Sequence, residues 1–160
     1  MADNIAEIDY AVPVTDEMEN MYLNFSVGSE IYGIEIRYVI QIIGMQEITE
    51  MPEMPHGTKG FINLRGNVIP VVSVRLRFGK PEEEYTQRTC IIVVHVDGKE
   101  IGLIVDGIQE TITIEPDNIS PPPVTDINSQ VPYIMGIAKL TGGRNAILIQ
   151  VQKLFLGAGD

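Results

Sequence analysis

The chain has 160 residues and 44% of them are hydrophobic, so it is long enough to bury the core of one ordinary domain. Eleven Lys and Arg stand against 22 Asp and Glu, which gives a formal net charge of -11. Because a surface of this balance repels phosphate backbones and anionic membrane faces, the composition argues against nucleic acid as a partner.

The first 20 residues differ from the rest of the chain. They contain six acidic residues and no Lys or Arg, without a sustained apolar period. We therefore interpret 1–20 as a flexible acidic tail. No basic region followed by an apolar stretch begins the chain, and no apolar run approaches the ~18 residues of a membrane span. We expect a cytoplasmic protein without direct membrane insertion.

From Tyr22 onward the chain consists of short runs rich in Val and Ile, separated by Gly, Asn, Asp or Pro, a pattern typical of β-strands. Asp97-Gly98 is the strongest hairpin signal, because both residues tolerate the positive φ of a type I′ turn. Gly66-Asn67 predicts a similar turn. The predicted strands are 23–27, 31–36, 68–74, 90–96, 101–105 and 146–151, and the segments compatible with short helices are 36–43 and 151–156.

The two halves of the chain resemble each other. YGIEI at 32–36 aligns with IGLIV at 101–105, a shift of 69 positions from 32 to 101. A looser match pairs 60–66 with 136–142. A unit of roughly 65 to 70 residues has the size of a small closed barrel. We therefore predict a first sub-barrel at about 21–80 and a second at about 88–150, while the sequence leaves open which unit the last strand completes.

The sequence contains few residues in the arrangements that enzyme active sites need. His56 and His95 lie apart from any Cys, Asp or Glu at metal-ligand spacing, and the single cysteine, Cys90, lies in an apolar run where a buried structural role is expected. Asp97 and Asp106 each precede a glycine, which is the turn-forming use of aspartate. The sequence lacks phosphate-binding and nucleophilic-serine motifs. We therefore predict a non-enzymatic protein with no cofactor or metal, which works through a binding surface.

The segment 60–70 is the most distinctive candidate for that surface. Arg65 directly precedes Gly66, so an exposed guanidinium could present a rigid fork of donors to a partner's carboxylate or carbonyl group. The alternative is a solvated arginine at a hairpin tip, which composition alone favours.

Three segments in order, 32–39, 60–70 and 101–107, together resemble the CheW domain, and the resemblance covers 21–157. It implies an all-β fold of two intertwined five-stranded SH3-like β-barrels from an internal repeat, with short helical segments and a short C-terminal helix. It also implies a chemotaxis coupling protein, a scaffold that links the cytoplasmic tip of methyl-accepting chemoreceptors to the regulatory domain of the CheA histidine kinase.

The resemblance implies the site residues as well. Val39 and Arg65 match positions implicated in receptor contact, and Gly60 and Gly66 shape the adjoining backbone. Ile108, the repeat counterpart of Val39, is expected to line the opposite wall.

Gln41 is a further expected receptor contact, and it stands where a familiar relative carries glutamate, so partner preference stays open. Ile48 and Val68 are the residues expected at the kinase contact. Three other interpretations stay open: the adaptor half of a CheV protein, a regulatory domain cut from a larger CheA, and a small β-barrel enzyme or ligand carrier with its site between the repeats.

Overall fold

The computed structural model describes residues 19–50, 52, 57–122 and 133–158. The predicted tail 1–20 lies almost wholly outside this part of the chain, as does His56. The strands are β1 (Met21–Val27), β2 (Glu30–Glu35), β3 (Val39–Gly44), β4 (Thr58–Leu64), β5 (Asn67–Ser73), β6 (Cys90–Val96), β7 (Lys99–Val105), β8 (Gly107–Thr113), β9 (Ile119–Ser120), β10 (Ile134–Lys139) and β11 (Asn145–Ile149). The helices are η2 (Ile36–Tyr38), α2 (Val74–Arg77), η3 (Pro116–Asn118), η5 (Thr141–Gly143) and α3 (Val151–Ala158). The predicted all-β fold with short helical segments is confirmed.

The local signals in the sequence give the local structure. Asp97 and Gly98 have φ of 53° and 79°, so they form the expected left-handed turn between β6 and β7. The segment 36–43 contains one turn of 3-10 helix before β3 begins, and α3 begins at Val151. Cys90 is half-buried and not fully buried, because it is the first residue of β6 and lies at the end of the apolar run.

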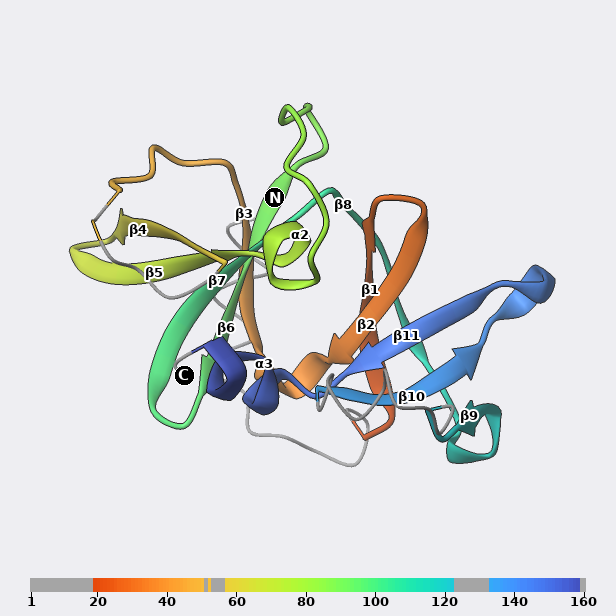
Figure 1. The fold of residues 1–160 in the computed structure, drawn as a ribbon. Helices are drawn as coiled ribbons and strands as arrows, with labels where there is room; N and C mark the ends of the chain where they lie inside the picture. The colour runs from red at the N-terminus through yellow and green to blue at the C-terminus, as the bar shows by residue number, and fades with distance from the viewer. Residues whose placement is uncertain (1–18, 51, 53–56, 123–132, 159–160) are drawn as a thin grey trace.

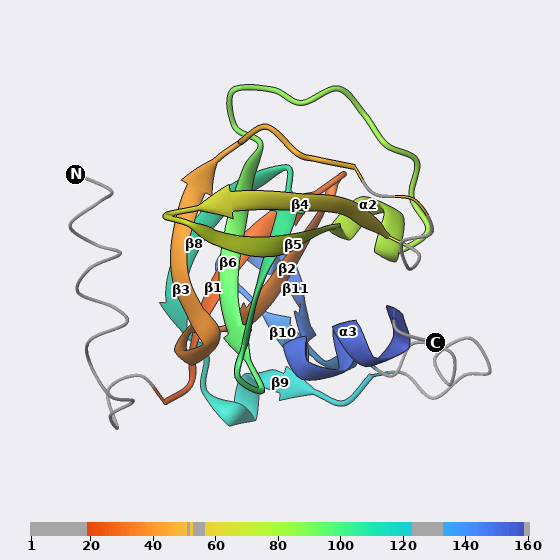
Figure 2. The same ribbon diagram turned by 90° about the vertical axis from the view of Figure 1, so that its left-hand side faces the viewer.

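The strands form two sheets that exchange hairpins (Figures 1 and 2). One sheet has the order β3-β6-β7-β5-β4, so the β6–β7 hairpin comes from the second half of the chain. The other has the order β8-β1-β2-β11-β10-β9, in which β1–β2 comes from the first half. The predicted intertwining is therefore confirmed. The ranges 21–80 and 88–150 describe the sequence repeat and not the two sheets, and β9 adds a sixth strand to one of them.

Two parallel strand pairs hold the exchanged hairpins in place. Leu148 of β11 lies opposite Gly33 of β2, and Val71 of β5 lies opposite Gly102 of β7. A Cβ added to Gly33 would lie 2.7 Å from Oδ1 of Asn24 and 3.0 Å from the Leu148 side chain, and one added to Gly102 would lie 2.8 Å from the side chain of Ile91. The repeat therefore preserves glycine at 33 and 102 because the chains approach too closely for a side chain.

The largest core cluster lies between the two sheets. It contains Phe25 and Ile34 of one sheet and Val94 and Leu103 of the other, each at most 1% exposed, together with Leu154 of α3. A smaller cluster lies within each sheet's own barrel. Because the shared cluster draws on strands of both halves, the two barrels form one cooperative domain.

An ion pair fastens the junction of the sheets at its edge. Arg75 of α2 donates through Nε to Oδ1 of Asp106 at 3.0 Å and through Nη2 to Oδ2 at 2.7 Å. The amide of Gly28, in the β1–β2 turn, donates to the same carboxylate at 2.7 Å, and Arg75 also donates to the carbonyl of Pro81 at 3.2 Å. Asp106, which the sequence presented only as a turn residue, therefore connects one sheet to the hairpin turn of the other.

Asp106→Asn tests this junction. Burial acts to raise the pKa of Asp106, but the hydrogen bonds from Arg75 and Gly28 and the charge of Arg75 lower it, and the resulting pKa is below the ordinary value. A lowered pKa stabilises the folded state above the unfolded pKa of ~3.9, and this contribution is lost as the pH falls through the folded value. We expect the variant to lose about 1–2 kcal/mol of unfolding free energy at pH 7 and the difference from wild type to shrink below about pH 4.

Urea unfolding at pH 7, 5 and 3 measures this difference. Asp97→Asn is the matched control, because Asp97 is exposed and asparagine also suits its turn. A constant difference between wild type and Asp106→Asn across the three pH values would contradict the assigned role of the carboxylate.

Candidate protein-binding groove

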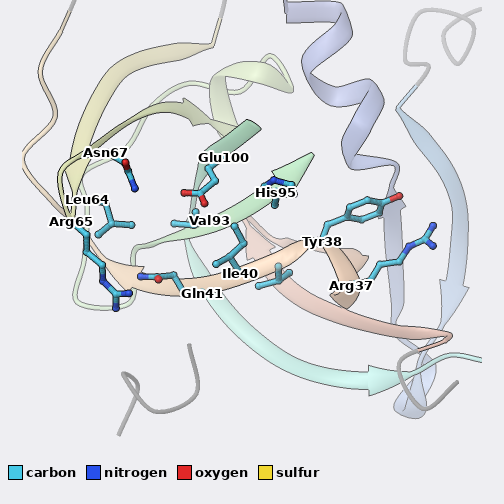
Figure 3. A pocket seen from close by; sticks show the side chains of 11 residues that line it. Arg37, Tyr38, Ile40, Gln41, Leu64, Arg65, Asn67, Val93, His95 and Glu100 are labelled. Carbon is cyan, nitrogen blue, oxygen red and sulfur yellow. The ribbon is translucent and has the colours of Figure 1, made fainter. Parts of the chain in front are cut away.

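A groove of about 540 Å³ runs along β3 and is bounded by the β4–β5 turn and the β6–β7 hairpin (Figure 3). It is lined by Arg37, Tyr38, Val39, Ile40, Gln41, Leu64, Arg65, Asn67, Val93, His95 and Glu100. Strands from both halves of the chain contribute, because β6 and β7 belong to the exchanged hairpin. The groove is therefore a product of the intertwined fold.

The floor of the groove is apolar. Val39 is half-buried and packs against the core shared by the two sheets. Ile40 and Leu64 are half-buried against the core of the five-stranded sheet that contains β3 to β7. Val93 is part of that core. An apolar floor with polar groups at its rim is typical of sites that bind an amphipathic segment of another protein.

The β4–β5 turn presents Arg65 at one end of the groove. Arg65 and Gly66 have φ of 53° and 86° and connect Leu64 to Asn67, so the turn residues are 65–66 and not 66–67 as predicted. The amide of Gly66 donates to Oδ1 of Asn63 at 3.1 Å, which closes the turn. Among the described residues the guanidinium of Arg65 makes no hydrogen bond or ion pair, and the side chain is exposed. It is available to a partner's acceptor group.

Three of the six residues predicted for receptor contact line the groove together: Val39, Gln41 and Arg65. In Figure 3, Gln41 and Arg65 lie side by side at the same end. Gly66 adjoins Arg65 in the turn. Ile108 does not line this groove: it lies on β8 opposite Phe25 and packs against the shared core. The expected opposite wall is instead formed by the β6–β7 hairpin.

Gly60 lies away from the groove lining and closes the barrel. Its φ is 149°, and an added Cβ would lie 2.1 Å from the carbonyl oxygen of Thr49. Thr49 and Phe61 exchange two backbone hydrogen bonds of 2.9 Å across this contact. Gly136 is the repeat counterpart, where a Cβ would lie 2.9 Å from the carbonyl oxygen of Ser120. In each barrel the repeated glycine permits its strand to approach a neighbouring backbone.

The two residues expected at the kinase contact differ in exposure. Val68 is 63% exposed on the outer face of β5, in line with the exposed Pro70 and opposite Asn63 and Phe61 of β4 on that face. Ile48 is half-buried against the core of the same sheet. Of the two, only Val68 offers a large apolar surface to a partner.

The sequence could have revealed a further pair of groove residues. His95 and Glu100 lie directly opposite each other on β6 and β7, and both line the groove. The two-residue turn at 97–98 fixes that register. His95 is exposed, as expected for the outer face of its strand.

Within the described part of the chain, no group of three or more His, Cys, Asp or Glu side chains is arranged to hold a metal ion. None of the helices described here is long and apolar enough to cross a membrane.

Gly60→Ala and Gly66→Ala compare a glycine that a close backbone contact requires with a glycine that only adopts a positive φ. Gly60→Ala forces Cβ against the Thr49 carbonyl, so we expect a loss of about 2–4 kcal/mol in unfolding free energy. Gly66→Ala meets nothing within 4 Å, so it costs only the left-handed conformation, about 1 kcal/mol. Urea denaturation of both variants checks this order, and equal losses would show that Thr49 yields without cost.

The chain is similar to known proteins over most of its length. The family model described as the CheW-like domain matches residues 21–158. The chemotaxis protein CheW of Klebsiella aerogenes is 32% identical over 133 residues, 83% of this chain and 80% of that protein. The chemotaxis protein CheW of Helicobacter pylori is 34% identical over 72% of this chain and 70% of that protein. The crystal structure of the scaffolding protein TtCheW from Thermoanaerobacter tengcongensis superimposes with a TM-score of 0.76 and 38% identity, covering 85% of this chain and 92% of that one.

Proposed function

The chain belongs to the CheW-like domain family, and we propose that it is a non-enzymatic coupling protein that links methyl-accepting chemoreceptors to the CheA histidine kinase. The groove would receive the cytoplasmic tip of the receptor, and another surface would hold the regulatory domain of the kinase. The protein would be cytoplasmic and would join chemoreceptor arrays through protein contacts alone. The observation that carries the proposal is the meeting of Val39, Gln41 and Arg65 in one groove.

The chemistry of the groove suits a helical tip. Its half-buried apolar floor can accept the apolar stripe of a helix, and the exposed Arg65 can pair with a carboxylate or cap a helix carbonyl. Gln41 is 9% exposed, and its amide offers both a hydrogen-bond donor and an acceptor. A glutamate at this position would instead need a partner of opposite charge. Receptor preference would therefore depend more on Arg65 than on Gln41.

We place the kinase contact on the outer face of the β4–β5 hairpin. Val68 is exposed there and follows Asn67, which lines the groove, so one hairpin would carry residues of both contacts. Ile48 would support this surface from beneath, since it packs inside the same barrel. A single rigid hairpin between two partners gives a direct route for one binding event to change the energy of the other.

No bond is made or broken in this mechanism. Each contact would bury at most about the 1,200–2,000 Å² of a standard interface, so single contacts can be weak. An array raises the effective concentration of each partner and restores strong binding through avidity. Receptor conformation then acts on the kinase through the free energy of the ternary assembly.

Arg65→Ala should weaken binding of a receptor signalling-tip fragment by about five- to thirtyfold, because an anchoring arginine typically contributes 1–2 kcal/mol. Calorimetric titration with wild-type and variant protein measures the change. Arg144→Ala is the matched control, since Arg144 is exposed in the β10–β11 turn. That turn lies at the opposite end of the ribbon from the β4–β5 hairpin, which carries Arg65 (Figure 1). Binding of the kinase regulatory domain and thermal stability should stay near wild type. If Arg65→Ala and Arg144→Ala bind the receptor fragment with equal affinity, Arg65 does not contribute to the receptor contact.

Val68→Ser should weaken binding of the kinase regulatory domain by at least about threefold, because it removes an exposed apolar contact without disturbing the core. Surface plasmon resonance on the isolated regulatory domain gives the affinity. Tyr85→Ser is the control, since Tyr85 is another exposed apolar side chain, 47% exposed in the α2–β6 connection. If Tyr85→Ser weakens kinase binding and Val68→Ser does not, the kinase surface lies elsewhere.

A further inference from the structure

We propose that the groove has a second recognition point at its other end, where Arg37 and Tyr38 take an acidic side chain of the receptor helix and Gln152 of α3 holds Tyr38 in position. This inference rests on the proposed function and assigns three residues that neither the repeat nor the resemblance singled out. In Figure 3, Arg37 and Tyr38 occupy the end of the groove opposite Arg65.

The hydroxyl group of Tyr38 is held by the C-terminal helix. Tyr38 ends η2, a single helical turn whose N-cap makes no side-chain hydrogen bond. Nε2 of Gln152 donates to the hydroxyl oxygen of Tyr38 at 2.5 Å, across 114 positions of sequence. The ring also packs against the core shared by the two sheets, and the hydrogen bond from α3 fixes the hydroxyl group at its end.

The helix that carries Gln152 is itself fixed. Val151 and Leu154 are 1% and 2% exposed in the core shared by the two sheets. The carbonyl of Leu154 accepts a hydrogen bond from Nε of Arg77 in α2 at 3.0 Å. The helix therefore offers a rigid support for the ring of Tyr38.

Arg37 is placed over that ring and stays open to a partner. Its guanidinium lies 5.0 Å from the centroid of Tyr38, a cation–π distance, and 3.5 Å from the carboxylate of Glu35. The side chains of this pair are 47% and 28% exposed, so the ion pair is weak and a carboxylate from a partner can compete for the arginine. The end of the groove thus presents a positive charge on a fixed aromatic face.

The placement of the two arginines suits an acidic helix. Arg37 and Arg65 lie at opposite ends of the groove, and Val39 and Ile40 of the apolar floor line it between them. A receptor helix that lies along this floor would meet one arginine at each end.

The net charge of the protein favours contact of an acidic helix at the two ends of the groove. The protein carries a net charge of -11, so most of its surface repels an acidic helix. Within the groove, Glu100 is the acidic residue, and it lines the middle beside His95 and not either end. An acidic partner is therefore favoured at the two arginine ends over the middle, and at the Arg37 end it competes with the carboxylate of Glu35.

Charge reversal at each end tests the recognition point. We expect Arg37→Glu to weaken binding of the receptor signalling-tip fragment by about tenfold at 50 mM salt, and the loss to be smaller at 300 mM because the contact is exposed and screened. Arg144→Glu changes the net charge equally and should bind within about twofold of wild type. Titration calorimetry at both salt concentrations gives these ratios.

A double-mutant cycle tests the role of Gln152 as a positioning residue. Tyr38→Phe and Gln152→Leu each remove the same hydrogen bond, so each should weaken receptor binding by about two- to tenfold. The double variant should be no weaker than the single ones, because the bond can be lost only once. Kinase binding of the three variants should match wild type, and their thermal stability should fall no further than the loss of one hydrogen bond accounts for, which a general loss of structure would not allow.

The outcomes separate this inference from the proposed function. If wild type binds the receptor fragment and Arg65→Ala weakens it, while Arg37→Glu behaves as Arg144→Glu does, the second recognition point is wrong and the coupling function stands. Additive effects of Tyr38→Phe and Gln152→Leu would overturn the positioning role of α3. If wild type does not bind the receptor fragment, the proposed function itself fails.

Discussion

The parallel pairing of β2 with β11 and of β7 with β5 is the constraint on which the rest of the structure depends. Each pair joins a strand of one half of the chain to a strand of the other, and each requires a glycine, Gly33 or Gly102, at the point of closest approach. Neither half can complete its sheet alone, because its first hairpin is inserted into the other sheet. The core between the sheets and the Arg75–Asp106 pair then stabilise an arrangement that this exchange has already fixed.

The groove follows from the same exchange. Its floor and one end come from β3 and the β4–β5 hairpin, while the middle is formed by His95 and Glu100 of the inserted β6–β7 hairpin. The C-terminal helix reaches the other end through Gln152. Residues from three distant parts of the sequence therefore meet in one site, whose floor packs against the buried core.

A coupling protein needs contacts whose energies depend on each other, and the architecture supplies short connections between surfaces. The β4–β5 hairpin carries Arg65 at its turn and Val68 on its outer face. The turn between its strands is closed by the hydrogen bond from Gly66 to Asn63, and Asn63 lies opposite Val68 on the neighbouring strand. Partner binding at one would then be felt at the other as a change in free energy, without catalysis.

The sequence by itself determined the features that local chemistry controls. Short runs rich in Val and Ile predicted six of the described strands, β1, β2, β5, β6, β7 and β11, but not β3, β4, β8, β9 or β10. Asp97-Gly98 specifies its turn and the register of His95 with Glu100, and the repeat identifies Gly33 and Gly102 as equivalent. The place of Arg65 beside a turn glycine was also predictable, although the turn lies one residue earlier than expected. The resemblance implied intertwined barrels, but only the tertiary structure decided which hairpins are exchanged, the contact of Gly60 with Thr49 and the position of Ile108 outside the groove lining. Parallel pairing between strands about 30 residues apart, or over 100 apart for β2 and β11, leaves no local signal, because its register depends on which chains the shared core brings together.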